Sequence, residues 1–317
     1  MRAHVASPWC TRIAANSAER YPFLGTDVDA KTQSQRTEQI QVIRVLDIMN
    51  EWYMRHLMLA LFATLTMSPV CSIAETVAIK PLGKTGPCTV ANWKLDWPNC
   101  KYEDGVKEGH LSVVSREGGK RFRVDYEVGG IGPEKGGVGW RFPIAKRESA
   151  TFSYVVRFSP DFDWVKGGKL PGLSGGPESV TGGRPANGTN GFSCRLMWRA
   201  DGRGEAYVYH MNQKGKYGDS FPFPKDFRYP TNEDLAVRMK IVMNTPGRRD
   251  GKLLVLIGSA GSPEEKLVVD RGDIEWRSVP DLGVDSVLFE TFHGGSNKTW
   301  APSRDCWTEF SSITVDE

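Results

Sequence analysis

The chain has 317 residues, of which 39% are hydrophobic and 25% are charged, enough for one large domain to bury a proper core. The formal net charge of only +3 argues against a nucleic-acid partner. It still permits a local basic groove for an acidic ligand.

The first 74 residues do not look like part of the fold. After the basic start Met54-Arg55-His56, Leu57 to Met67 forms an apolar run too short to span a bilayer, and Ser72-Ile73-Ala74 supplies small residues that a signal peptidase reads. These features predict a signal peptide over residues 49–74 with cleavage after Ala74; a buried helix is the alternative interpretation. Residues 1–48 are then an upstream extension, from a start codon placed too early or from a disordered or targeting segment.

Residues 75–317 are expected to form a single domain that is secreted or periplasmic, monomeric, and free of the membrane after signal cleavage. Export makes disulfides plausible. Cys88 and Cys100 flank a short Trp-rich segment and are expected to pair, whereas Cys194 and Cys306 either pair or stay buried as free thiols. No cysteine or histidine spacing indicates zinc, so we expect no metal and no cofactor.

Short alternating runs bounded by Gly, Pro and Asp recur along this part of the chain, and long helical periodicity is absent. Such runs, rich in Val, Phe and Tyr, are typical of an all-β fold. We expect a β-jelly-roll sandwich of two antiparallel sheets, with a substrate groove across one concave sheet. The clearest strands are expected at 121–128, 150–158, 235–243, 252–257 and 286–292.

Two Gly-rich segments are expected to be loops. Gly129 to Gly139 does not follow the strand-to-helix pattern of a nucleotide site. Ser174 to Gly191 is long for a compact domain, and it acts either as a flap over the groove or as a passive surface connection.

Strands at 192–199 and 205–211 are expected to form a hairpin around Asp201-Gly202-Arg203-Gly204. An odd-numbered loop places Arg195 opposite Tyr209 and Met197 opposite Tyr207, with all polar groups on one face. A two-residue loop would place Arg195 opposite Val208 and disperse the site, because a one-residue slip turns every side chain over. We adopt the odd loop. The other face then packs inward through Phe192, Cys194, Leu196, Trp198, Ala206 and Val208.

The polar face carries the groups that β-elimination of a uronate requires. Arg195 can hold the sugar carboxylate bidentately, and Lys169 can add a point charge as negative charge builds up. Tyr207 or Tyr209, with a pKa lowered by these cations, can take the C5 proton and return it to the departing O4. In β-linked glucuronate or mannuronate both atoms lie on the same side of the ring, so one tyrosine suffices. Each residue taken alone is more often structural; only the combination indicates function.

The sequence resembles polysaccharide lyase family 14, which includes alginate and glucuronan lyases. The resemblance spans roughly residues 120–315 and rests on Gly167-Gly168-Lys169-Leu170-Pro171-Gly172-Leu173, Ser193-x-Arg195, Tyr207-x-Tyr209, Thr291-Phe292-His293-Gly294-Gly295-Ser296 and Trp300-Ala301-Pro302-Ser303.

The resemblance implies a β-jelly roll that cleaves a polyuronate without a metal. It implies charge neutralisation by Lys169, substrate binding by Ser193 and Arg195, and proton transfer by Tyr207 and Tyr209. Lys169→Ala and Tyr209→Phe are therefore each expected to abolish turnover.

Three further residues are candidates for contacts with an acidic sugar chain. They are His293 in a Gly-rich stretch, Trp300 as part of a wall together with Lys298 and Arg304, and Arg141 after Gly139-Trp140. His210 is expected to point inward, because it alternates with Tyr209.

Two other functions stay open at this point. One is a non-catalytic module that binds an acidic polysaccharide on the same scaffold. The other is a glycoside hydrolase on a related sandwich, for which Glu205 and Glu290 are available as the two carboxylates.

Overall fold

A computed structural model describes residues 49, 52–54 and 76–316. The expected upstream extension, the signal-peptide cleavage site and the start of the mature domain at residue 75 lie outside the described residues. Within the described part, no helix is long and apolar enough to cross a membrane.

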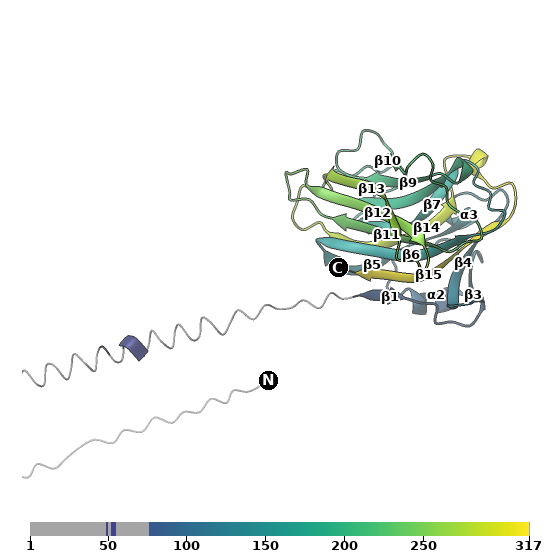
Figure 1. Ribbon diagram of the computed structural model, residues 1–317, viewed down its shortest axis with the longest axis horizontal. Helices are drawn as coiled ribbons and strands as arrows, with labels where there is room; N and C mark the ends of the chain where they lie inside the picture. The colour runs from purple at the N-terminus through teal and green to yellow at the C-terminus, as the bar shows by residue number, and fades with distance from the viewer. Residues whose placement is uncertain (1–48, 50–51, 55–75, 317) are drawn as a thin grey trace, which may run out of the picture. The chain divides into compact units, whose positions relative to one another are not determined.

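Residues 76–316 form a β-jelly-roll sandwich of two antiparallel sheets (Figure 1), as the sequence predicts. The first sheet has the strand order β13-β12-β11-β6-β15-β4-β3-β2, with β1 paired to β15. Its strands are β1 (Val77–Ile79), β2 (Gly86–Pro87), β3 (Leu111–Arg116), β4 (Gly119–Tyr126), β6 (Ser149–Phe158), β11 (Leu235–Val242), β12 (Gly251–Ser259), β13 (Glu265–Ile274) and β15 (Cys306–Asp316). We call it the outer sheet.

The second sheet, which we call the groove sheet, has the order β10-β9-β8-β7-β14-β5. Its strands are β5 (Gly137–Arg147), β7 (Gly167–Gly175), β8 (Phe192–Arg199), β9 (Gly204–Tyr209), β10 (Asp219–Pro222) and β14 (Val284–His293). The short helices are α2 (Val90–Asp96), α3 (Gly132–Gly136), η1 (Ala200–Gly202) and η2 (Lys298–Trp300).

The core lies between the sheets because every second side chain of each strand points inward. On β6 the alternation is complete: Ala150, Phe152, Tyr154, Val156 and Phe158 are all buried. The facing layer of the groove sheet includes Leu170, Leu196, Trp198, Val208 and Phe289. The hairpin residues expected to point inward are all buried, which confirms the prediction: Phe192, Cys194, Leu196, Trp198, Ala206 and Val208.

Two local expectations were wrong. The segment 129–139 is not all loop: Pro133 follows Gly132 in the first turn of α3, where its missing N–H costs nothing, and β5 begins at Gly137. The expected disulfide is absent, since Cys88 and Cys100 are free thiols whose pKa values burial raises to about 11 and about 12. Helix α2 lies between them and carries the chain about 10 Å along its axis.

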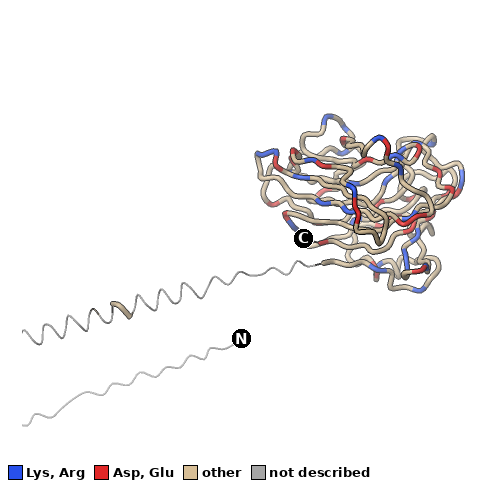
Figure 2. The backbone as a smooth tube through the Cα atoms, viewed as in Figure 1, with Lys and Arg blue, Asp and Glu red and all other residues tan. Residues whose placement is uncertain are grey.

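Charges of both signs are spread over the whole domain (Figure 2). In this view Lys and Arg are interspersed with Asp and Glu, so the pattern of charge does not mark out a site.

Candidate active site

The hairpin β8–β9 brings its polar residues to one face, but in a different register from the expected one. Arg195 lies opposite Tyr207, Ser193 opposite Tyr209, and Met197 opposite Glu205. The connection is odd-numbered, as expected, but it lies one residue earlier in the chain: Arg199 and Arg203 close it with a hydrogen bond from the Arg199 N–H to the Arg203 carbonyl at 2.7 Å, and Ala200–Gly202 form the turn. The odd length keeps each side chain on its predicted face, while the one-residue displacement of the turn shifts each partner by two positions.

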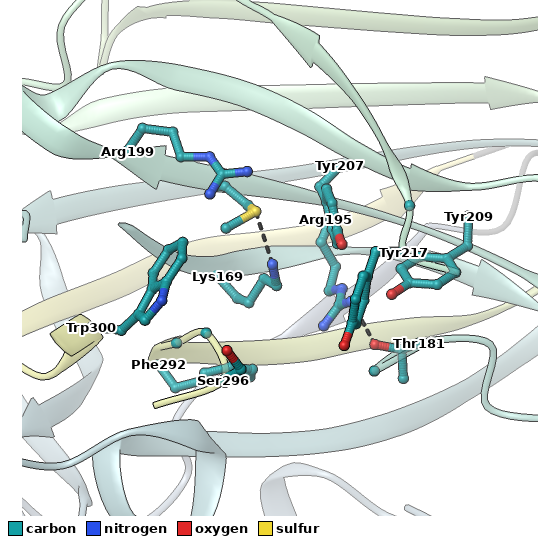
Figure 3. Close-up of a pocket in the computed structure, with 15 residues that line it drawn as sticks. Lys169, Thr181, Arg195, Arg199, Tyr207, Tyr209, Tyr217, Phe292, Ser296 and Trp300 are labelled. Carbon is teal, nitrogen blue, oxygen red and sulfur yellow. Dashed lines mark hydrogen bonds between the residues drawn. The ribbon is translucent and has the colours of Figure 1, made fainter. Parts of the chain in front are cut away.

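A cavity of about 570 Å³ lies on this face of the groove sheet (Figure 3). Five residues predicted from the sequence line it together: Lys169, Arg195, Tyr207, Tyr209 and Trp300. Its other lining residues are Thr181, Gly182, Met197, Arg199, Tyr217, Gly218, Phe292, Gly294, Gly295 and Ser296. The required convergence of an ammonium, a guanidinium and two phenols on one surface is therefore present.

Lys169 lies in the middle of the cavity (Figure 3). It pairs with Met197 across β7 and β8, and its Nζ donates a hydrogen bond to the Met197 Sδ at 2.8 Å. The same nitrogen lies 4.0 Å from the centroid of the Tyr207 ring. The preceding residue, Gly168, packs against the core residue Trp198, where a Cβ would lie 2.0 Å from the ring.

The ammonium form of Lys169 is disfavoured. Burial, followed by the positive charges of Arg195 and Arg199, lowers its pKa well below the usual value. None of the ion pairs found among the described residues includes Lys169, and its hydrogen-bond acceptor is a thioether, which is a weak one. Lys169 is thus a partly buried amine without a carboxylate partner among the described residues.

Arg195 forms the floor of the cavity and is almost fully buried, with 2% of its surface exposed. One terminal nitrogen, Nη1, pairs with the Glu290 carboxylate. The other, Nη2, donates to the Thr181 hydroxyl at 2.5 Å. The guanidinium is therefore held from two sides where it lines the cavity.

The two tyrosines differ in exposure. Tyr207 is half-buried, whereas Tyr209 is 1% exposed and accepts a hydrogen bond from the Gly183 N–H at 3.1 Å. Their rings meet edge-on at 5.6 Å. Burial raises the pKa of Tyr207 and the hydrogen bond to Tyr209 adds to this, while Arg195 opposes it. The expectation that nearby cations lower this pKa was wrong for the free protein, because desolvation outweighs them.

Ser193 and Arg141 lie on the groove face but outside the cavity. The segment 176–191, which we call the flap, covers them. Ser193 Oγ donates to the Val180 carbonyl at 2.6 Å, and Arg141 donates to the Gly176 carbonyl at 2.7 Å and to the Asp285 carboxylate at 2.7 Å. The expectation that they bind substrate directly is corrected: in the structure they anchor the flap. Strand alternation gave the right face but not what covers it.

His293 does not line the cavity either. It is fully buried, stacks on Phe162, and its Nε2 lies 2.6 Å from the Asp163 carbonyl. Burial lowers its pKa to about 4. Its neighbour Phe292 faces the cavity, so His293 faces the core. Strand alternation could have indicated this, because His293 continues the i, i+2 series of the inward residues Val287, Phe289 and Thr291.

One end of the cavity combines Arg199 with Trp300 (Figure 3), where the guanidinium carbon lies 5.9 Å from the ring centroid. Arg199 also pairs with Glu205 at 2.6 Å. Sequence reasoning missed Arg199, although it continues the i, i+2 series from Arg195 and Met197. Thr181 and Tyr217 come from loops, whose positions strand alternation does not predict.

Among residues 49, 52–54 and 76–316, no group of three or more His, Cys, Asp or Glu side chains is arranged to hold a metal ion.

Comparison with known proteins places these features in a family. The family model described as polysaccharide lyase 14 matches residues 114–313. The PL-14 alginate lyase from Aplysia kurodai is 25% identical, with a TM-score of 0.65, over 75% of this chain and 98% of its own. The alginate lyase Aly36B is 27% identical, with a TM-score of 0.64, over 76% and 96%.

A further structural neighbour shares the fold. The alginate lyase vAL-1 from Chlorella virus is 19% identical, with a TM-score of 0.59, over 75% of this chain and all of its own. Among curated proteins, none matched this chain.

Proposed function

Because the chain belongs to the polysaccharide lyase 14 family and is a polysaccharide lyase, we propose that its cavity cleaves a polyuronate, alginate or glucuronan, by β-elimination. The observation that carries this proposal is the cavity itself, in which Lys169, Arg195 and Tyr207 surround one space wide enough for a sugar residue.

The electrostatics of the free protein favour Lys169 as the group that accepts the C5 proton. The pKa of Lys169 is lowered, which favours its neutral amine form, whereas the pKa of Tyr207 is raised, which favours the protonated phenol that can give a proton to O4. This assignment revises the sequence-based one, in which a tyrosine is the base and Lys169 is only a charge. Arg195 lines the cavity and receives the substrate carboxylate there, with Thr181 beside it.

Two solved complexes of Aly36B support the proposal. One variant of that enzyme, with a lysine and a tyrosine replaced by alanine, holds an alginate tetrasaccharide; another, with a lysine and a methionine replaced, holds a trisaccharide. The lysine and methionine of the second variant lie 28 positions apart. Lys169 and Met197, in contact here, are also 28 positions apart.

The contacts of the two candidate carboxylates disfavour a hydrolase. Glu205 is paired with Arg199 and Glu290 with Arg195, and neither glutamate lines the cavity, so they do not face a sugar as an acid and a base. A non-catalytic binding module would have no use for a buried amine with a lowered pKa.

A substrate panel tests the proposal. The protein is incubated with polymannuronate, polyguluronate and glucuronan, and products are followed by ultraviolet absorbance and mass spectrometry. Unsaturated ends on at least one polymer are expected. Reducing sugars without ultraviolet absorbance would instead identify a hydrolase, and binding without any product would identify a binding module.

We also propose that the enzyme is exported and acts as a monomer. Amino-terminal sequencing of the protein recovered from its host's medium or periplasm is expected to begin at Glu75. A start upstream of Leu57 would contradict cleavage of a signal peptide. Light scattering of the purified protein checks the oligomeric state.

A further inference from the structure

Glu290 lies beneath the cavity and both of its carboxylate oxygens are occupied. Oε2 pairs with Arg195 Nη1, and Oε1 accepts a hydrogen bond from the Tyr102 hydroxyl at 3.0 Å. The side chains of Glu290 and Arg195 are 9% and 2% exposed. Glu290 does not line the cavity, so it can act on the reaction only through its partners.

The contacts of Glu290 extend from one edge of the sheet to the flap. Tyr102 follows α2, and the backbone of nearby Asp104 is bonded to Gly139 of β5 in both directions, at 2.9 and 3.0 Å. On the other side, Arg195 continues to the Thr181 hydroxyl. A chain of side chains from the α2–β3 connection through β14 and β8 to the flap therefore sets the direction of one guanidinium.

We propose that Glu290 is a positioning residue of the lyase reaction, which holds the Arg195 guanidinium in the orientation that receives the substrate carboxylate and offsets its charge beside Lys169. This inference rests on the proposed function of the cavity.

Glu290 also contributes to the field at the reacting groups. The charged and titratable groups that face them are Arg195 and Arg199 from β8, Glu205, Tyr207 and Tyr209 from β9, Glu290 from β14, and Tyr102 and Asp104 from the α2–β3 connection. The negative charges of Glu205 and Glu290 raise the pKa of Lys169, against burial and the two arginines.

Removal of the Glu290 charge therefore lowers the pKa of Lys169 further. It also lowers that of Tyr207, because the charge of Arg195 is no longer offset. The direction is the same whichever of the two accepts the C5 proton.

A merely structural role is the alternative, and the outer sheet offers a matched control. Glu309 of β15 is fully buried and binds Arg116 through two nitrogens, at 2.5 and 3.0 Å. It belongs to the outer sheet, and the cavity lies on the groove sheet. Replacement of either glutamate removes a buried carboxylate that pairs with an arginine, but the Arg116 side chain is 40% exposed, and only Glu290 holds a cavity residue.

The test compares Glu290→Gln, Glu290→Asp and Glu309→Gln with the wild type, by kcat and KM across pH on the polymer that the wild type cleaves. In Glu290→Gln the acidic limb of the kcat/KM profile is expected to move about one pH unit lower. In Glu290→Asp the charge stays but the contact lengthens, so kcat is expected to fall about a hundredfold without that movement. Glu309→Gln is expected to lower the melting temperature and leave the profile unchanged.

An unmoved profile in folded Glu290→Gln, with a loss of melting temperature like that of Glu309→Gln, would overturn the inference and leave the proposed function intact. If Glu290→Gln does not fold, Glu290→Asp decides alone: a loss of kcat supports positioning, and wild-type kcat refutes it.

If the wild type cleaves no polyuronate, the proposed function fails separately. The inference is then decided by the pH dependence of acetic anhydride labelling of Lys169, measured by peptide mass spectrometry in wild type and Glu290→Gln. A lower midpoint in the variant supports the role of Glu290, and equal midpoints overturn it.

Discussion

The two sheets carry the same kinds of contact between arginine, tryptophan and carboxylate side chains, but only the groove sheet has the cavity. On the outer sheet, Arg123 lies 4.8 Å from the centroid of the Trp307 ring and pairs with Asp125 at 2.7 Å, and Arg116 pairs with Glu309. On the groove sheet, Arg199 approaches Trp300 and Arg195 pairs with Glu290. Arginine, tryptophan and carboxylate together therefore do not identify a site.

The groove sheet differs in two respects. Its outward face is hollowed into a cavity by the flap and by the segment 294–300. It also buries a lysine that has no carboxylate partner among the described residues. An amine whose charged form is disfavoured is suited to take up a proton beside an anionic ligand, whereas a paired cation on an open sheet is not.

The largest expected effect on activity is at Lys169, the lysine that distinguishes the groove sheet. Lys169→Arg keeps a positive charge but cannot act as a base near neutral pH, so kcat is expected to fall about a thousandfold if Lys169 accepts the proton. Lys240→Arg, on the outer sheet, is the control and is expected to keep full activity. Ultraviolet absorbance measures both. Substantial activity in Lys169→Arg would return the role of base to a tyrosine and leave Lys169 as a charge.

A smaller effect on activity is expected when Trp300 of the cavity is replaced, with Trp307 of the outer sheet as the control. Trp300→Ala removes a cavity wall and is expected to raise KM about tenfold, or about 1.4 kcal/mol, with little change in kcat. Trp307→Ala removes an equivalent ring from the outer sheet and is expected to leave KM unchanged. Initial rates over a range of polymer concentrations provide the measurement; an equal KM in both variants would exclude Trp300 from substrate binding.

Loss of the hydrogen bond from Ser193 to the flap is expected to lower activity less than the changes at Lys169 and Trp300. Ser193→Ala removes the donor to the Val180 carbonyl, which costs about 1 kcal/mol and loosens the flap, so kcat/KM should fall about fivefold or less. Ser311→Ala on β15 serves as the comparison. A loss of a hundredfold or more would mean that Ser193 contacts substrate directly, as the resemblance implied.

No effect on activity at neutral pH is expected from His293→Gln, which keeps a donor for the Asp163 carbonyl but does not titrate. In the wild type the pKa of His293 is about 4 when folded and near 6.5 when unfolded. The unfolded chain then binds the proton first, so stability is lost as pH falls from 6.5 to 4, by about 3 kcal/mol. Urea unfolding at several pH values is expected to show a shallower loss in the variant; identical slopes would contradict this.

The sequence predicts which face of a strand each site residue lies on, but not the register between the two strands. Strand alternation placed Arg195, Tyr207 and Tyr209 on one face and Trp198 on the other, because a period of two depends only on local backbone geometry. The register of the hairpin was off by two, because the loop closes through a hydrogen bond between Arg199 and Arg203 that strand patterns do not predict.

The sequence by itself determined the all-β class, the sandwich, and the grouping of an ammonium, a guanidinium and two phenols, since each follows from local pattern and motif. Tertiary structure alone decided that the flap covers Ser193 and Arg141, that Glu290 holds Arg195, and that burial moves the pKa values of Lys169 and Tyr207 in opposite directions. The physical reason is that cover, pairing and desolvation arise between segments far apart in the chain.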